Sequence, residues 1–267
     1  MAENNLEEIS SCQVDRLKVR LFKNKAEMGK AAAFEVADRM KEMLRGKNMI
    51  NMIFAAAPSQ DSFLRFLIDV DGLDWNRVRA FHLDEYLGLP KKADQKFENY
   101  LKDHIFEKVN MGEIYYIDDP NLNSPEQKCN RYEDLLEKYP VDIACLGIGE
   151  NGHIAFNDPP VADFDDLQSV KVVELDSRCR QQQVNDGCFD TIQDVPKKAI
   201  TMTIPEIMKA RYIPCVVPGP TKREAVRCTL EGQINTQCPA SVLRRHSNAT
   251  LFIDREAADY LEEFCCY

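Results

Sequence analysis

Two periodicities alternate along this chain. Short apolar runs rich in β-branched residues predict buried strands, and the segments between them repeat apolar residues every three or four positions, which predicts helices. Residues 49–57 (MINMIFAAA) form an uninterrupted apolar run, as expected of a central parallel strand that is covered on both faces. Residues 25–47 are rich in Ala, Met, Lys and Glu and place apolar side chains at helical spacing.

Strand and helix signals alternate over nearly the whole length. Strands are predicted at residues 16–22, 49–57, 78–83, 113–117, 141–146, 170–175, 199–204, 211–217 and 250–253. Helices are predicted at residues 25–47, 61–70, 95–109, 124–138 and 221–230, with a partly helical stretch after 175 and a terminal helix after 253. This order predicts an α/β fold with a doubly wound, mostly parallel sheet. The chain has no repeat and no Gly/Ser linker, so we predict a loose tail at residues 1–15 and one domain at 16–267.

The composition narrows the class of partner. The 267 residues are 44% hydrophobic and 29% charged, an ordinary globular composition, and a net charge of −10 argues against nucleic acid or an anionic membrane as partner. An anionic small substrate would need a local cationic pocket. The first ten residues lack the features of a signal peptide, and no apolar run reaches the length of a membrane span. We therefore expect a cytoplasmic protein, with assembly into a homo-oligomer left open.

The cysteines do not indicate a metal site. Ten cysteines are scattered along the chain, without a C-x-x-C pair or a Cys/His cluster at the spacing of zinc ligands. We expect neither a metal nor another cofactor.

Residues 141–160 (VDIACLGIGENGHIAFNDPP) carry the strongest functional signal. A buried strand at 141–146 opens into a glycine-rich loop that contains Gly152, His153 and Asp158. Ligands of open α/β sheets bind outside the carboxyl ends of the strands, and an imidazole placed there can move protons near neutral pH. A hydrogen-bonded structural role for His153 is the alternative.

The same loop contains the pattern G-x-G-x-x-G, which is typical of dinucleotide sites. That motif must open a crossover helix. Here two prolines at 159–160 follow six residues after His153, and residues 161–166 have no helical period. The sequence therefore disfavours a nucleotide cofactor.

Asp84 and Glu85 follow the strand predicted at 78–83. Neighbouring side chains of a strand point to opposite sides, so only one carboxylate can face a pocket, and Asp84, which closes the strand, is the preferred base. Capping of the turn is the alternative role.

Ser59 and Lys222 lie at two predicted helix starts. Free backbone N–H groups and the helix dipole favour a phosphate at such a position, and a lysine adds a cation. An ordinary N-cap and a solvated surface lysine are the alternatives. Together with the carboxylate base and the histidine, a phosphate site suits proton abstraction beside the carbonyl of a sugar phosphate.

These residues also carry a resemblance. The segments FHLDEYLGLP and GIGENGHIAFNDP, with Lys222 after PGPT, are similar to the glucosamine-6-phosphate deaminase (isomerase) family. The related 6-phosphogluconolactonases share the G-x-G…G-H core but lack the IAFN and DEY-x-G-L-P segments. The resemblance implies a modified Rossmann-like single domain that converts glucosamine 6-phosphate, an amino-sugar phosphate, and water into fructose 6-phosphate and ammonia.

The resemblance also implies roles for individual residues. Asp84 matches the base that carries a proton between C2 and C1, and His153 matches the histidine that promotes ring opening. Asp158 and Asn151 match the polar partners of that histidine. Ser59 and Lys222 match phosphate-binding positions, and Glu85 and Gly152 complete the expected substrate contacts.

Several positions depart from the family pattern. Asn151 replaces the usual Asp, and Asp158 replaces Glu, which shortens the reach toward His153 by about 1.5 Å. Gln183 stands where a phosphate-binding arginine is expected. Arg178 and Arg180 lie within a helical turn of it and are candidates for that phosphate contact, provided that one of them turns inward.

Two other functions remain open at this point. One is a sugar-phosphate lactonase of the same fold, and the other is a catalytically silent sugar-phosphate sensor. A sensor would be expected to lose Asp84 or His153, and this chain keeps both.

Overall fold

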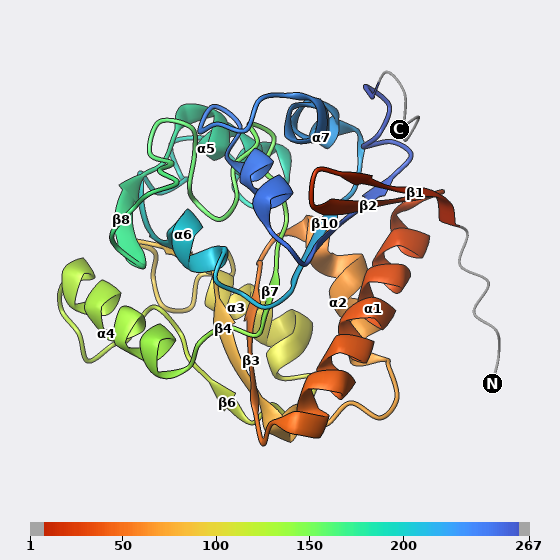
Figure 1. Ribbon diagram of the computed structural model, residues 1–267. Coiled ribbons are helices and arrows are strands. Elements are labelled where there is room, and N and C mark those ends of the chain that lie inside the picture. The colour runs from red at the N-terminus through yellow and green to blue at the C-terminus, as the bar shows by residue number, and fades with distance from the viewer. Residues whose placement is uncertain (1–7, 262–267) are drawn as a thin grey trace.

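The computed structural model describes residues 8–261 and has an α/β fold around one twisted sheet (Figure 1). Over these residues the strands run in the order β6-β4-β3-β7-β10-β11-β2-β1, with β7 and β10 joined by two parallel bridges. All neighbours are parallel except β1, which pairs antiparallel with β2. The bounds are β1 Glu8–Val14, β2 Leu17–Phe22, β3 Ile50–Phe54, β4 Val78–His82, β6 Glu113–Ile114, β7 Ile143–Cys145, β10 Ile213–Val217 and β11 Ala249–Asp254.

Helices cover both faces of this sheet. Figure 1 shows α1 and α2 side by side along one flank and α4 on the other. The helices are α1 Lys25–Gly46, α2 Asp61–Ile68, α3 Phe97–Leu101, α4 Pro125–Lys138, α5 Ser177–Asn185, α6 Ile204–Ile207 and α7 Arg223–Glu231, with a π-helical turn at Lys102–Phe106 and 3-10 turns at Pro58–Gln60, Trp75–Arg77, Pro220–Lys222 and Pro239–Arg245. None of the helices in residues 8–261 combines the length and the apolar character that crossing a membrane requires.

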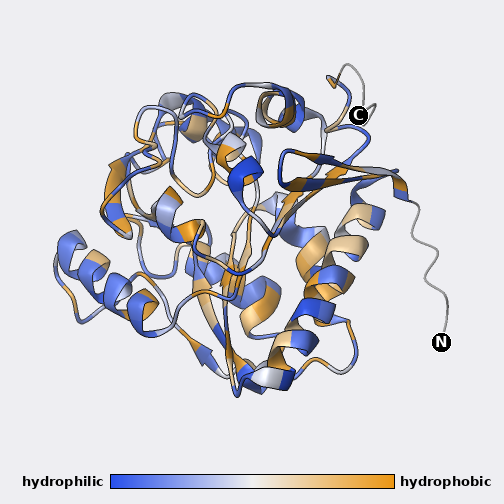
Figure 2. Ribbon diagram, in the orientation of Figure 1, coloured by the Kyte–Doolittle hydropathy of each residue, from blue (hydrophilic) through white to orange (hydrophobic). Residues whose placement is uncertain are grey.

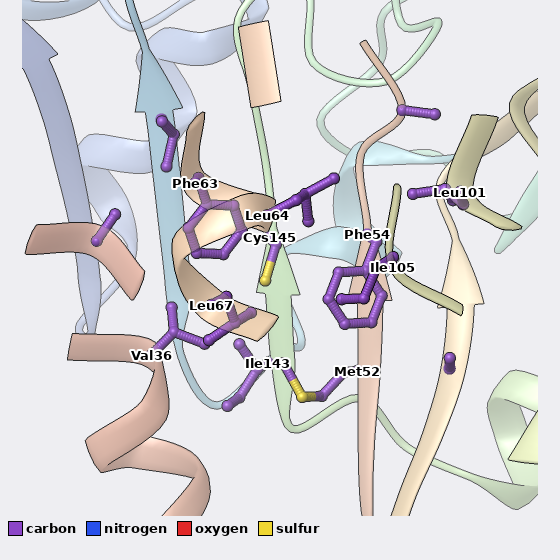
Figure 3. Packing of buried hydrophobic residues seen from close by; sticks show 14 of the residues in the cluster. Val36, Met52, Phe54, Phe63, Leu64, Leu67, Leu101, Ile105, Ile143 and Cys145 are labelled. Carbon is purple, nitrogen blue, oxygen red and sulfur yellow. The ribbon is translucent and has the colours of Figure 1, made fainter. Parts of the chain in front are cut away.

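Alternate residues of the strands supply two separate cores. Met52 and Phe54 of β3 pack on the side of α1 and α2, whereas Ile53 packs in the cluster that contains Tyr132 of α4. Figure 3 shows that α2 packs against β7 through Phe63, Leu64 and Leu67. Figure 2 shows hydrophobic residues on the central strands and a mostly hydrophilic α4 with single hydrophobic positions. The uninterrupted apolar run predicted a strand buried on both faces, and the structure confirms it.

A smaller antiparallel sheet lies beside the main one. It has the order β5-β9-β8, with β5 at Asp84–Tyr86, β8 at Val170–Glu174 and β9 at Lys198–Met202. β5 begins two residues after the end of β4, so the chain leaves the main sheet and enters the small sheet within the segment that carries Asp84. This second sheet was not predicted as a separate unit.

The ends of the chain differ from the prediction. Residues 8–14 form strand β1 and not part of a loose tail, because their backbone pairs with β2 through a turn at Asp15, whose φ is +52°. Residues 255–260 form turns and not a helix, and residues 262–267 lie outside the described range.

The helix predicted at 95–109 is split into α3 and a π-helical turn. By contrast, α4 agrees closely with the helix predicted at 124–138, and Ser124 caps it in a capping box with Gln127.

Glu85 ties the start of α3 to β5. Its carboxylate accepts hydrogen bonds from the backbone N–H groups of Tyr86 (2.9 Å), Phe97 (3.2 Å) and Glu98 (3.0 Å). Burial raises the pKa of this carboxyl to about 7, and these bonds together with Lys96 oppose the rise only in part. Glu85 therefore has a structural role that the sequence did not reveal.

This arrangement predicts a pH dependence of stability that disappears in Glu85→Gln. A carboxyl whose pKa is higher in the folded chain contributes stability that is complete below the unfolded value of 4.5 and is lost as the pH rises to about 7. We expect the free energy of unfolding of the wild type to fall relative to that of Glu85→Gln over this range, by at most about 3 kcal/mol. Urea denaturation at several pH values measures the difference. A constant difference between the two proteins would contradict the assignment.

Candidate active site

The carboxyl ends of four neighbouring strands place the predicted site residues at one edge of the sheet. In β3, Phe54 pairs with His82 of β4 and with Cys145 of β7, so these three strands end level with one another. β10 joins beside β7 through the bridge between Leu146 and Cys215. The segments that leave these ends carry the serine, the carboxylates, the histidine and the lysine singled out in the sequence.

These segments enclose a cleft. Asp84, His153, Ser59 and Lys222 all line it. The remaining lining comes from the segments after the same strands, from the start of α3 and from α5: Ala55, Ala56, Ala57, Gln60, Leu83, Phe97, Gly147, Ile148, Gly149, Ala155, Phe156, Gln182 and Gln183. Four residues that lie far apart in the sequence therefore face one space.

His153 is held by two oxygen acceptors. Its Nδ1 lies 2.7 Å from Oδ1 of Asn151 and 3.0 Å from Oδ1 of Asp158. The amide of Asn151 also donates to Asp158 at 2.9 Å. Because both neighbours of Nδ1 accept, Nδ1 carries the proton and Nε2 is left with a lone pair. The shorter aspartate thus reaches His153 directly, and Asn151 completes the contact.

Asp158 is ionised in this arrangement. Burial by itself would raise the pKa of the carboxyl, but the His153 imidazole and hydrogen bonds from Asn151 and the backbone of Asp176 outweigh burial and hold the pKa below its usual range. Asp158 is 1% exposed, so its negative charge acts on His153 with little screening by water.

Two glycines make the loop around His153 possible. A Cβ on Gly149 would lie 2.0 Å from Cε1 of the His153 ring, so only a glycine leaves room for the imidazole. Gly152 has a φ of +83°, and a Cβ there would approach Sγ of Cys238 to 2.9 Å. Gly152 itself does not line the cleft, so its role is to shape the loop.

Asp84 has an environment suited to a base. Burial raises the pKa of this carboxyl well above its usual value, and the negative charges of Glu85 and Asp158 raise it further. A carboxylate with a raised pKa is a stronger base than one in water. Glu85 points away from the cleft into the start of α3, which confirms the expectation that only one of the two faces the pocket.

His82 positions Asp84 and was missed in the sequence. Its Nε2 accepts from the backbone of Ile117 (2.9 Å), so the ring donates from Nδ1 to the carbonyl of Asp84 (2.9 Å). Burial lowers the pKa of His82 to about 3, so the ring is neutral. The hydroxyl of Tyr132 bonds both backbone groups of His82. The only indication of this role in the sequence was the position of His82 in FHLDEYLGLP, two residues before Asp84.

The cleft is also lined by a cation. Lys222 is 4% exposed and forms no ion pair within the described residues. Burial lowers the pKa of its ammonium, and the nearby charges of Asp186 and Glu150 oppose this effect. Ser59 lies in the turn that leads into α2, and Gln60 leaves its buried Oε1 without a hydrogen-bond partner.

Neither arginine of α5 reaches the cleft. Arg180 donates to the backbone carbonyls of Ile192 and Val195, and Arg178 is exposed. In this structure neither side chain is placed to substitute for the missing arginine. Gln183 lines the cleft instead, 8% exposed, and brings a neutral amide where a cation was expected.

Comparison with known proteins gives relatives along most of the chain. Residues 23–252 match the family model described as glucosamine-6-phosphate isomerases/6-phosphogluconolactonase. A glucosamine-6-phosphate deaminase of Halothermothrix orenii is 34% identical over 248 residues, which cover 92% of this chain and all of that protein. One from Bacillus cytotoxicus is 40% identical over 191 residues, which cover 72% of this chain and 71% of the relative.

Solved structures agree with this assignment. A monomeric glucosamine-6-phosphate deaminase of the NagB superfamily has a TM-score of 0.83 and 34% identity, covering 91% of this chain and 99% of that one. A 6-phosphogluconolactonase from Thermotoga maritima has a TM-score of 0.71 and 19% identity, covering 89% and 99%, and shares the fold. The family model covers most of the chain, and the relatives agree with it, as do the level strand ends that bring Asp84 and His153 into one cleft. The chain therefore belongs to the glucosamine-6-phosphate isomerase/6-phosphogluconolactonase family.

Proposed function

We propose that this protein is a glucosamine-6-phosphate deaminase, which converts glucosamine 6-phosphate and water into fructose 6-phosphate and ammonia. The observation that carries the proposal is the cleft itself, in which Asp84, His153 and Lys222 face one space. The deaminase relatives at 34% and 40% identity support the same reaction. The substrate is a small amino-sugar phosphate, and we place the enzyme in the cytoplasm.

The phosphate binds beside Lys222 in this proposal. Lys222 supplies the charge, and the hydroxyl of Ser59, in the turn that leads into α2, supplies a further donor. Gln183 contributes an amide hydrogen bond but no charge. The phosphate is therefore neutralised by one side chain.

His153 opens the sugar ring. Its Nε2 accepts the proton of the hydroxyl on C1, and the charge that develops on the imidazole is stabilised by Asp158 at 3.0 Å. The same proton returns to the ring oxygen as the bond between that oxygen and C1 breaks. The open chain then has an aldehyde at C1 and an amine at C2.

Asp84 carries out the isomerisation. In the open chain the C2 proton is acidic because the carbonyl is adjacent, and the Asp84 carboxylate removes it and delivers it to C1. The oxygen on C1 becomes a hydroxyl by taking up a proton that the nitrogen on C2 gives up. The nitrogen is then an imine, which water hydrolyses to a ketone and ammonia. Burial of Asp84 strengthens it as the base and keeps bulk water from exchanging the proton.

A lactonase of the same fold is the rival function. Hydrolysis of a sugar-phosphate lactone needs an activated water but no carboxylate that moves a proton between two carbons. The lactonase structures are below 20% identity and support only the fold. Release of ammonia from glucosamine 6-phosphate, measured beside hydrolysis of 6-phosphogluconolactone, separates the two activities.

Removal of the base tests the role of Asp84. We expect Asp84→Asn to lower kcat for ammonia release by roughly 10²–10⁴-fold, the usual contribution of general acid–base catalysis. Glu85→Gln keeps Asp84 in place and should lose far less activity. Steady-state assays on both variants decide the matter, and a larger loss in Glu85→Gln would show that the wrong carboxylate was assigned.

Lys222 should carry an unusually large share of phosphate binding. We expect Lys222→Ala to raise KM at least about tenfold, which corresponds to about 1.4 kcal/mol. The loss should fall on KM more than on kcat, because the phosphate is held equally in the ground and transition states. Arg178→Ala is the matched control, since it removes an exposed positive charge outside the cleft. An equal effect of the two substitutions would place the phosphate elsewhere.

A further inference from the structure

A third side chain, that of Cys179, lies close to the pair formed by His153 and Asp158 and does not line the cleft. Cys179 lies on the inner face of α5 and is 1% exposed. Its thiol lies close to the Asp158 carboxylate, and burial together with that negative charge raises the pKa of the thiol. No step of the proposed reaction uses this thiol.

The three side chains are close enough to share one ion. Within the described residues, one ligand atom each from His153, Asp158 and Cys179 lies within 4.8 Å of the other two. Two ligand atoms of a tetrahedral zinc ion with bonds of about 2.0–2.3 Å lie roughly 3.3–3.8 Å apart. Movement of these side chains by about 1 Å would therefore bring all three into bonding range.

The donor set also selects a class of ion. Imidazole, thiolate and carboxylate together are typical ligands of Zn²⁺ and similar borderline or soft divalent cations, whereas Mg²⁺ and Ca²⁺ prefer oxygen. A dication with one thiolate and one carboxylate has no net charge. Neutrality favours binding here, since all three side chains are buried.

We propose that His153, Asp158 and Cys179 form a binding site for Zn²⁺ or a similar soft divalent cation, and that its occupation reversibly inhibits the enzyme. Three protein ligands leave a fourth position for water, as in other zinc sites with an open position. The inhibition rests on the proposed function, but the binding does not.

Binding of the ion rearranges two protons. Cys179 binds as a thiolate, so its proton leaves to solvent. His153 binds through Nδ1, the atom that faces Asp158, and the proton of that nitrogen is replaced by one on Nε2. The net change is one Zn²⁺ bound and one proton released.

The new position of the histidine proton accounts for inhibition. With the ion on Nδ1, Nε2 becomes a donor and can no longer accept the proton of the C1 hydroxyl. The ion also binds the carboxylate of Asp158, which otherwise stabilises the charged imidazole. Ring opening stops although the cleft, Asp84 and Lys222 are unchanged.

A second pair of thiols offers an internal control. Cys228 on α7 and Cys238 are in contact, and Cys238 packs against Gly152 of the same loop. These two thiols could bind a soft ion outside the cluster. Cys228→Ser tests that competing location without changing the three proposed ligands.

The test uses Co²⁺ as a spectroscopic probe. The chelator-treated wild type, kept reduced with a phosphine, is titrated with Co²⁺, and the ultraviolet charge-transfer absorption of a cobalt–thiolate bond is recorded. Displacement by Zn²⁺ then gives the zinc affinity. We expect the wild type and Cys228→Ser to show the absorption, with one equivalent bound, and Cys179→Ser to lack it.

Activity assays supply the second readout. Cys179→Ser keeps a hydroxyl beside Asp158 but removes the thiolate, so we expect it to release ammonia in the absence of metal. Half-inhibition of this variant should need more than about 100-fold more Zn²⁺ than half-inhibition of the wild type. Loss of a residue that only supports a metal ligand lowers metal affinity by at most about 100-fold, so a larger effect indicates a ligand. Cys179→Ala serves the same purpose if the serine variant does not fold.

Three results would overturn the site. They are no cobalt–thiolate absorption in the folded wild type, persistence of that absorption in both Cys179 variants, or its loss in Cys228→Ser. A wild type that binds Co²⁺ through Cys179 but releases no ammonia would instead reject the proposed function and leave the metal site intact.

Discussion

The parallel register at the centre of the sheet is the constraint on which the site depends. Because Phe54 pairs with both His82 and Cys145, β3, β4 and β7 end at the same height. Each strand then releases a segment with a different chemical role at one edge. A shift of one residue in β4 would turn its side chains to the opposite face and move Asp84 out of the cleft. The catalytic geometry is thus fixed by hydrogen bonds that involve no catalytic side chain.

Much of this arrangement follows from sequence patterns. The apolar runs located the main strands because burial on both faces leaves an unmistakable composition, and the glycine loop marked His153 and Asp158 by residue type. Strand β1 was not found, since its polar residues pair through the backbone at the edge of the sheet. The spacing of residues in the sequence also gave no indication that Cys179 lies near His153. The two are 26 residues apart, and the packing of α5 brings them together. Contacts of this kind depend on packing between elements.

The electrostatics of the cleft run against those of the whole protein. The chain has a net charge of −10, yet the buried ammonium of Lys222 lines the cleft, whereas ionised Asp158 contacts His153 and does not line the cleft. Under the proposed function, the phosphate of the substrate is attracted to Lys222, and this attraction orients the sugar in the cleft. Arg178 and Arg180 became candidates for the phosphate contact from their distance in the sequence alone. In the structure, Arg180 bonds the carbonyls of Ile192 and Val195, and Arg178 is exposed.

The close approach of Gly149 to the histidine limits how the loop can vary. The imidazole occupies the space that any side chain at this position would need, and its Nδ1 is held by Asn151 and Asp158, so the ring cannot step aside without losing both partners. In natural or engineered variants of this chain, a larger residue at 149 would displace the imidazole. Under the proposed function, we expect such a variant to lose ring opening even where His153 itself is retained.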